Sequence, residues 1–259
     1  MARIRVTLDG REAVNGSPLL MHNERLADPL DPYSKWVAEI SKKTKKTERE
    51  IEELSRREFQ GAGYWDVNEG PDGKDNGVPV IPVWNIIRCI QEAAKSHKFG
   101  KQVIRALVPI TDTVELSYDG PRLVDELWKA QTFHSRKGVG VGQRKVMRTR
   151  PCFSDWRIDV ELELDLTQLD PGQVNLFTYE AGKYIGLGDA RPRFGRFLGT
   201  AELLEIPAEF VVPDVLDDVR SELARQAQQQ SIQKDDVAHR ENNPDGKARR
   251  KSVKRVLDK

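Results

Sequence analysis

The sequence has few cysteines and no long apolar run, and each lack excludes a class of protein. Its 259 residues include only two cysteines, Cys89 and Cys152, which are far apart and lack the spacing of metal ligands. We therefore expect reduced thiols in a cytoplasmic protein, with no metal and no cofactor. No run of 18 apolar residues exists, so we expect no transmembrane helix, and the N-terminus lacks the apolar core of a signal peptide.

A large excess of charge of one sign is also missing. The chain carries 42 basic and 41 acidic residues, which gives a formal net charge of +1. Binding to nucleic acid therefore cannot be predicted from the total charge and has to come from local clusters of cations. Two stretches of the sequence contain such clusters.

The first cluster is a stretch rich in glycine and arginine at residues 184–197. Its glycines permit positive φ and let another backbone approach, and its arginines present planar forks that suit phosphate. The pattern favours a loop over phosphate or nucleic acid, in which we expect contacts from Gly186, Gly188, Arg191, Arg193, Phe194 and Arg196. The alternative is a tight connection from a helix to a strand whose arginines are solvated.

The second cluster lies at residues 131–151 and contains no acidic residue. Glycines at every second position, from Gly138 to Gly142, predict a bare β-hairpin that buries little apolar area and projects from the core. Its cations favour contact with phosphate: Arg136, Lys137, Arg144, Lys145, Arg148 and Arg150. The alternative is an exposed loop without regular structure.

The rest of the chain shows periodic segments that predict regular elements. The expected order is a strand at 3–8, two helices at 31–66, a helix at 82–100, strands at 103–110 and 114–118, a strand at 157–166, a helix at 170–182, a strand at 194–206 and a helix at 214–230. In the strand at 157–166, acidic residues alternate with apolar ones, so its polar face should repel phosphate. Residues 231–259 are polar and end in a basic run, which predicts a disordered tail.

This order predicts an α+β fold with a ferredoxin-like or RRM-like core over residues 1–213. To that core the sequence adds a helical insertion at 31–66, the projecting basic hairpin at 131–151, and a C-terminal segment at 214–259.

The glycine-rich loop and the order of elements resemble the RAMP superfamily, the RRM-like backbone subunits of CRISPR effector complexes. In that family a similar loop precedes the last strand, and a thumb hairpin reaches over nucleic acid held by the next subunit. The resemblance covers residues 1–10, 78–118 and 131–206, while the helices at 31–60 and the tail depart from it. The Leu-Ala-Asp-Pro-Leu-Asp-Pro-Tyr stretch at 26–33 is similar to a group of phage and prophage proteins.

These patterns favour a non-catalytic protein that binds single-stranded nucleic acid, RNA slightly more than DNA, and assembles as a homo-oligomer or filament along the strand. One alternative is a phage single-stranded DNA-binding or recombination accessory protein. Another is an RNA endonuclease, for which the resemblance points to His134 or Asp31, although Asp28 and Asp31 both precede proline and indicate turns. A third is a phage structural protein whose basic regions contact acidic partners.

Overall fold

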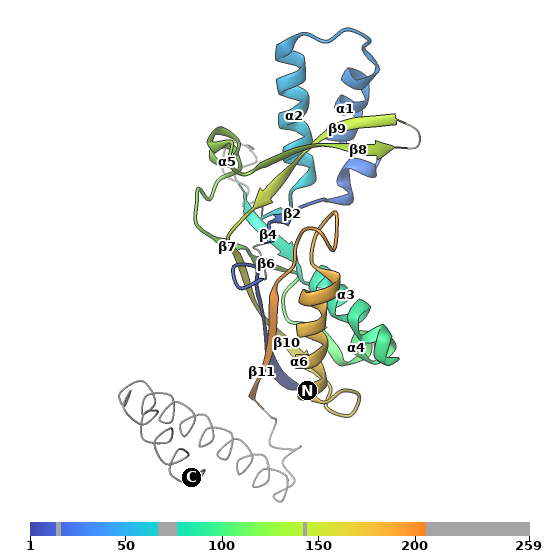
Figure 1. The fold of residues 1–259 in the computed structure, drawn as a ribbon, viewed down its shortest axis with the longest axis vertical. Coiled ribbons are helices and arrows are strands. Elements are labelled where there is room, and N and C mark those ends of the chain that lie inside the picture. Colours follow the sequence, from blue (N-terminus) through green and yellow to red (C-terminus); the bar gives the residue numbers. More distant parts are fainter. Residues whose placement is uncertain (14–16, 67–76, 142–143, 206–259) are drawn as a thin grey trace, which may run out of the picture. The chain divides into compact units, whose positions relative to one another are not determined.

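The computed structural model describes residues 1–13, 17–66, 77–141 and 144–205, and within them the protein is α+β. This part of the chain contains six α-helices and three antiparallel sheets (Figure 1). The predicted helix at 214–230 and the predicted tail lie outside the described residues. Among the described helices, none has the length and apolar character that crossing a membrane requires.

The largest sheet has the strand order β11-β1-β10-β5, and every neighbouring pair is antiparallel. Its strands are β1 (Ala2–Asp9), β5 (Leu107–Pro109), β10 (Trp156–Leu164) and β11 (Leu198–Glu205), and β7 (Ser117–Tyr118) also pairs with β10. Buried and more exposed positions alternate along β1 and β10, which confirms the alternation predicted from the sequence. Burial of one face fixes the pairing, because a shift by one residue would turn the apolar side chains to solvent.

The polar face of this sheet carries cross-strand ion pairs. Arg5 of β1 lies 2.9 Å from Glu161 of β10, and the Thr7 hydroxyl donates to Asp159 at 2.6 Å. Arg157 also pairs with Asp159. The acidic side chains of β10 are therefore largely matched by cations of the protein itself, and exposed pairs of this kind contribute little to stability.

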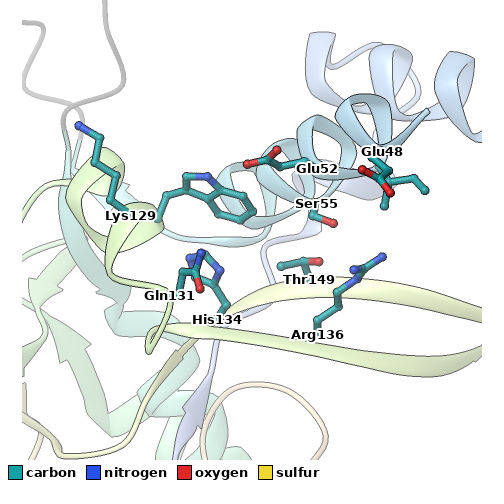
Figure 2. Close-up of a pocket in the computed structure, with 10 residues that line it drawn as sticks. Glu48, Glu52, Ser55, Lys129, Gln131, His134, Arg136 and Thr149 are labelled. Carbon is teal, nitrogen blue, oxygen red and sulfur yellow. The ribbon is translucent and has the colours of Figure 1, made fainter. Parts of the chain in front are cut away.

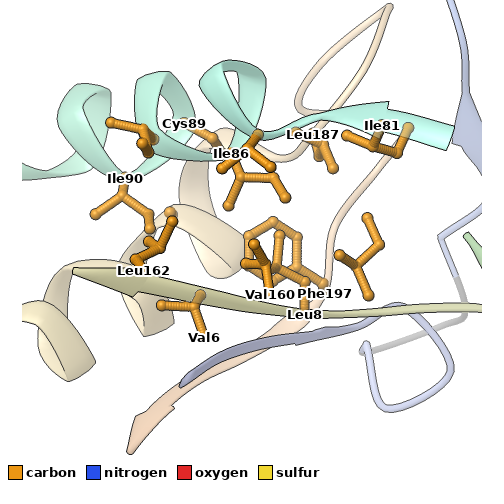
Figure 3. Close-up of a cluster of buried hydrophobic side chains, with 14 of the residues drawn as sticks. Val6, Leu8, Ile81, Ile86, Cys89, Ile90, Val160, Leu162, Leu187 and Phe197 are labelled. Atoms are coloured by element: carbon orange, nitrogen blue, oxygen red, sulfur yellow. The ribbon is translucent and has the colours of Figure 1, made fainter. Parts of the chain in front are cut away.

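Two helices, α3 (Val83–Ala94) and α6 (Pro171–Glu180), cover the apolar face of the sheet (Figures 1 and 3). Pro82 precedes α3, whose buried stripe includes Ile86 and Ile90. Asp170 begins α6 with a capping box, in which its side chain and that of Gln173 satisfy the first backbone N–H groups. The predicted starts of both helices are confirmed, because caps depend on neighbouring residues alone.

Four of the predicted boundaries are wrong. The expected strand at 114–118 is divided into β6 (Thr113–Glu115) and β7, which belong to different sheets. Residues 103–106 belong to a helix, α4 (Gly100–Ala106), and only Leu107–Pro109 form the expected strand. Val103 and Ala106 are buried with helical spacing, which so short an apolar run cannot distinguish from a strand. The expected helix at 82–100 ends at Ala94, and a 3-10 turn at Lys95–His97 follows, which left-handed Lys98 ends with a φ of 66°. The last strand begins at Leu198 rather than at Phe194.

The structure has an antiparallel hairpin where the sequence predicts one. Its strands are β8 (His134–Val141) and β9 (Arg144–Phe153), and β2 (Leu19–Leu20) pairs with the far end of β9. The third sheet consists of β3 (Trp65–Asp66), β4 (Val78–Pro82) and β6 (Thr113–Glu115).

The hairpin does not leave the core unsupported, which corrects the expectation of a bare projection. The helical insertion consists of α1 (Pro32–Lys42) and α2 (Glu48–Ala62), and α2 lies across β9 (Figure 1). α5 (Val124–Ala130) also packs against α2. Phe59 of α2 is fully buried, with its ring 4.8 Å from that of His134. At Gly140, further along β8, an added Cβ would meet no atom within 4 Å.

We expect Phe197→Ala to lower the free energy of unfolding by about 3–5 kcal/mol, because it removes a large buried ring. Phe197 is only 4% exposed and its ring lies edge-on to that of Trp156. Arg196 is exposed, so Arg196→Ala should change stability by less than about 0.5 kcal/mol. Urea denaturation of both variants measures the difference, and equal losses would contradict the assignment of these two side chains to opposite sides.

Candidate nucleic-acid interface

The glycine-rich loop packs on itself and on the segment that leads into β2. Within the loop, the Leu187 N–H donates to the Gly195 carbonyl at 2.7 Å. The loop also bonds to the backbone around β2. The Gly195 N–H donates to the Pro18 carbonyl at 2.9 Å, and the Asp189 N–H donates to the Leu20 carbonyl at 2.8 Å. These main-chain bonds hold the loop in one conformation, because each buried donor has its partner inside the protein.

Glycine is required in this loop by close approach of the protein's own backbone. Gly186, Gly188 and Gly195 have φ values of 81°, 82° and 71°, which side chains rarely adopt. A Cβ at Gly195 would overlap the Leu187 carbonyl, and one at Gly188 would overlap the Leu20 carbonyl. The sequence correctly predicted a close backbone contact, and the contact partner in the structure is the chain itself.

The three loop arginines remain on the surface. Arg191, Arg193 and Arg196 are all exposed, and Arg196 Nε donates to the Pro192 carbonyl at 3.1 Å. Phe194 is half-buried, with the Arg193 guanidinium 6.0 Å from its ring centroid. A rigid loop thus presents cations beside a partly exposed aromatic ring.

The hairpin and the loop meet, although they are far apart in sequence. The Lys137 ammonium lies 4.1 Å from the centroid of the Phe194 ring, which is a cation–π contact. Arg150 of β9 forms an ion pair with Asp189 of the loop. The two basic stretches that the sequence singled out separately therefore form one surface.

Two of the six predicted hairpin cations are held by carboxylates of the protein. Arg148 Nη1 lies 2.6 Å from Oε1 of Glu58, a carboxylate only 3% exposed, and Arg150 pairs with Asp189. Both arginines are therefore fixed in structural pairs. Arg136 and Lys137 are exposed. The side chains of Arg144 and Lys145 lie outside the described residues.

A cation that sequence reasoning missed joins this surface. Arg88 of α3 is exposed and lines a cavity of about 200 Å³ together with Arg191, Gly188 and Asn85. No acidic side chain of the described residues lines this cavity, so its charge suits a phosphate. In the sequence, Arg88 is only an arginine on the polar side of an otherwise apolar helix. That position does not reveal that the glycine-rich loop lies beside it.

The candidate catalytic carboxylates have structural partners. Asp28 accepts from the Leu30 N–H at 2.8 Å, which is the turn that its proline neighbour indicated. Asp31 caps α1 by accepting from the Tyr33 N–H, and Arg25 donates to its other oxygen. Cys89 is buried and donates to the Gly186 carbonyl, and burial raises the pKa of its thiol to about 12. Among the described residues, no group of acidic, histidine or cysteine side chains could hold a metal.

Comparison of the sequence with protein-family models gave no match, and comparison with curated proteins gave none either.

We expect Gly195→Ala to lower the free energy of unfolding by about 1–3 kcal/mol or more. Alanine at this position would have to adopt a positive φ, and its Cβ would overlap the Leu187 carbonyl. Gly140→Ala is the matched control at the hairpin tip, where the added methyl group meets nothing. Thermal melts should show a clear fall for Gly195→Ala and almost none for Gly140→Ala. The same fall in both would mean that the loop is not closely packed.

Stability should also fall on mild acidification. Burial lowers the pKa of His134, and burial with the nearby charges of Arg150 and Arg148 lowers the pKa of His22. Histidine in an unfolded chain has a pKa of about 6.5, which is higher than in the folded protein at these two positions. Below that pH the unfolded chain therefore binds more protons than the folded protein. The free energy of unfolding, measured in urea, should therefore be lower at about pH 5.5 than at about pH 7.5.

The carboxylates act in a separate pH range. Pairing with arginine lowers the pKa of Asp9 and Asp159. Their contribution to the free energy of unfolding is therefore lost only on further acidification, below about pH 4. The control is His134→Phe, which keeps an aromatic ring and should show a smaller fall between about pH 7.5 and 5.5. A wild-type free energy of unfolding that rises as the pH falls over this interval would contradict the lowered pKa values of His134 and His22.

Proposed function

We propose that this protein binds single-stranded nucleic acid without catalysing a reaction on it, and that it favours RNA slightly over DNA. The observation that carries the proposal is the contact of Lys137 with Phe194, which unites the hairpin and the glycine-rich loop. The loop beside this contact presents the exposed cations Arg191, Arg193 and Arg196, and Arg88 lines a cavity together with Arg191. Such a surface contacts phosphates with its cations and can stack a base on its aromatic ring.

A ferredoxin-like core is part of this proposal. We assign β1, α3, β5, β10, α6 and β11 to its six elements, in the order βαββαβ. The antiparallel strand order β11-β1-β10-β5 supports the assignment, as do the two helices on one face. The helix α4 and the hairpin then interrupt the core between consecutive elements.

The same arrangement supports a relation to the RAMP backbone subunits, with a phage or prophage origin. The hairpin lies between β5 and β10, and the glycine-rich loop lies between α6 and β11, as the resemblance requires. By that relation the protein would form a homo-oligomer along the strand. The part of the hairpin around Gly140 and the exposed Met147 is the segment that we expect to reach a neighbouring copy.

A single-stranded DNA-binding protein of phage replication or recombination is the alternative. Phosphates and base faces are common to both nucleic acids, so every contact proposed above is open to either. Titrations of RNA and DNA of the same sequence distinguish the two, and the proposal expects the tighter binding for RNA.

We expect affinity for a single strand to fall steeply with salt, because cations that contact phosphates release counterions. The Lys137→Ala/Arg193→Ala double variant removes the two cations that flank Phe194 and should reduce the slope of log affinity against log salt by about 1.4. A fluorescence titration between about 50 and 300 mM salt measures this slope.

The charge-matched control is Lys101→Ala/Arg105→Ala on α4, which removes two exposed cations far from the hairpin (Figure 1). It should bind like the wild type. Equal effects of the two double variants would show that binding follows total charge, and the proposed surface would then be wrong.

A further inference from the structure

A second cavity lies on the other side of the hairpin, between α2, α5 and the strands β8 and β9 (Figure 2). Its volume is about 660 Å³. The side chains that matter for its chemistry are Glu52, Ser55, Trp128, His134, Arg136 and Thr149. None of these residues belongs to the surface around Lys137 and Phe194.

Two of the residues that line this cavity each have a polar atom that is buried without a partner in the described part of the chain. These atoms are Nε2 of His134 and Oγ1 of Thr149, and Thr149 as a whole is only 3% exposed. A buried polar atom without a hydrogen bond is costly, so few remain in folded proteins. Two such atoms in one cavity indicate that a polar ligand completes them.

The state of His134 tells what this ligand must offer. Burial lowers the pKa of His134, so the imidazole is neutral near neutral pH. A neutral imidazole has one donor nitrogen and one acceptor nitrogen, and Nε2 is the nitrogen that is buried without a partner. With Nε2 as the acceptor, the ligand must supply an N–H or O–H donor.

The surrounding rings favour a flat ligand. The His134 and Trp128 rings are stacked, with centroids 4.2 Å apart and an interplanar angle of 20°. A donor that bonds to Nε2 lies near the plane of the imidazole, and the Trp128 indole beside it can contact a flat ring. We infer that this cavity holds one nucleobase with an exocyclic amino group, taken from the bound strand. This inference rests on the function proposed above.

The charges around the cavity favour a base over a phosphate. Glu48 and Glu52 are exposed at its border and repel a phosphate, whereas a base is neutral. Arg136 lies two residues after His134 on the same side of β8, as Figure 2 shows. It is placed to hold the phosphate of the nucleotide whose base enters the cavity.

The test compares wild-type binding of three strands of about 20 units: oligo(dC), oligo(dT) and a chain of abasic sites. Oligo(dC) carries the amino group, oligo(dT) lacks it, and the abasic chain keeps only the phosphates. We expect oligo(dC) to bind about tenfold more tightly than the abasic chain, with oligo(dT) between them.

Thr149→Val removes the unpartnered hydroxyl and keeps the shape of the side chain. It should leave the melting temperature unchanged or raise it, and it should reduce the preference for oligo(dC) over oligo(dT) about threefold or more. His134→Phe keeps a stacked ring, lacks the acceptor, and should have the same effect on the preference. The matched control is Thr200→Val, an exposed threonine on β11, which should retain the wild-type preference.

Equal binding of oligo(dC) and the abasic chain by the wild type would overturn the base site and leave the proposed function standing. An unchanged preference in Thr149→Val and His134→Phe would also overturn it. Binding of none of the three strands, with binding of an acidic protein instead, would overturn both the base site and the proposed function.

Discussion

The position of the hairpin depends on one buried carboxylate. Glu58 of α2 accepts from the Arg148 guanidinium and, with its other oxygen, from the Thr149 N–H at 3.0 Å. Removing either partner would leave a buried charge or a buried donor unmatched, which is far more costly than losing an exposed pair. The insertion therefore braces the hairpin on the side away from the glycine-rich loop, and the pairing of β9 with β2 and the Arg150–Asp189 ion pair hold it as well.

Local patterns in the sequence predicted much of this fold. The alternation along β1 and β10, the capping boxes at Thr47 and Asp170, and the hairpin itself all depend on residues close in sequence. The pairs that fix the site do not, since Glu58 and Arg148 are 90 residues apart. From sequence spacing alone, every arginine of a basic stretch is predicted to contact phosphate. Only the fold shows which of these arginines is paired with a carboxylate of the protein.

The near-zero net charge of the chain is compatible with a basic surface because opposite charges are matched elsewhere. On the polar face of the sheet, Arg5 and Arg157 lie beside the carboxylates of β10. In the hairpin, Arg148 and Arg150 serve the structure in the same way. The cations that remain exposed gather on the loop and on β8, so the local field there is positive while the total is close to neutral.

The alternation of side chains along β8 relates the two proposed sites to each other. Successive residues of a strand point to opposite faces, so Lys137 points to the loop while His134 and Arg136 point to the cavity beside α2. A strand whose phosphates follow the cations of the loop and of β8 can therefore turn a base over the hairpin into that cavity. The helical insertion, which departs from the RAMP pattern, supplies the wall of that cavity through Ser55 and Glu52. The insertion thus has two roles in the proposed arrangement, because Glu58 of α2 braces the hairpin and other residues of α2 enclose the proposed base site.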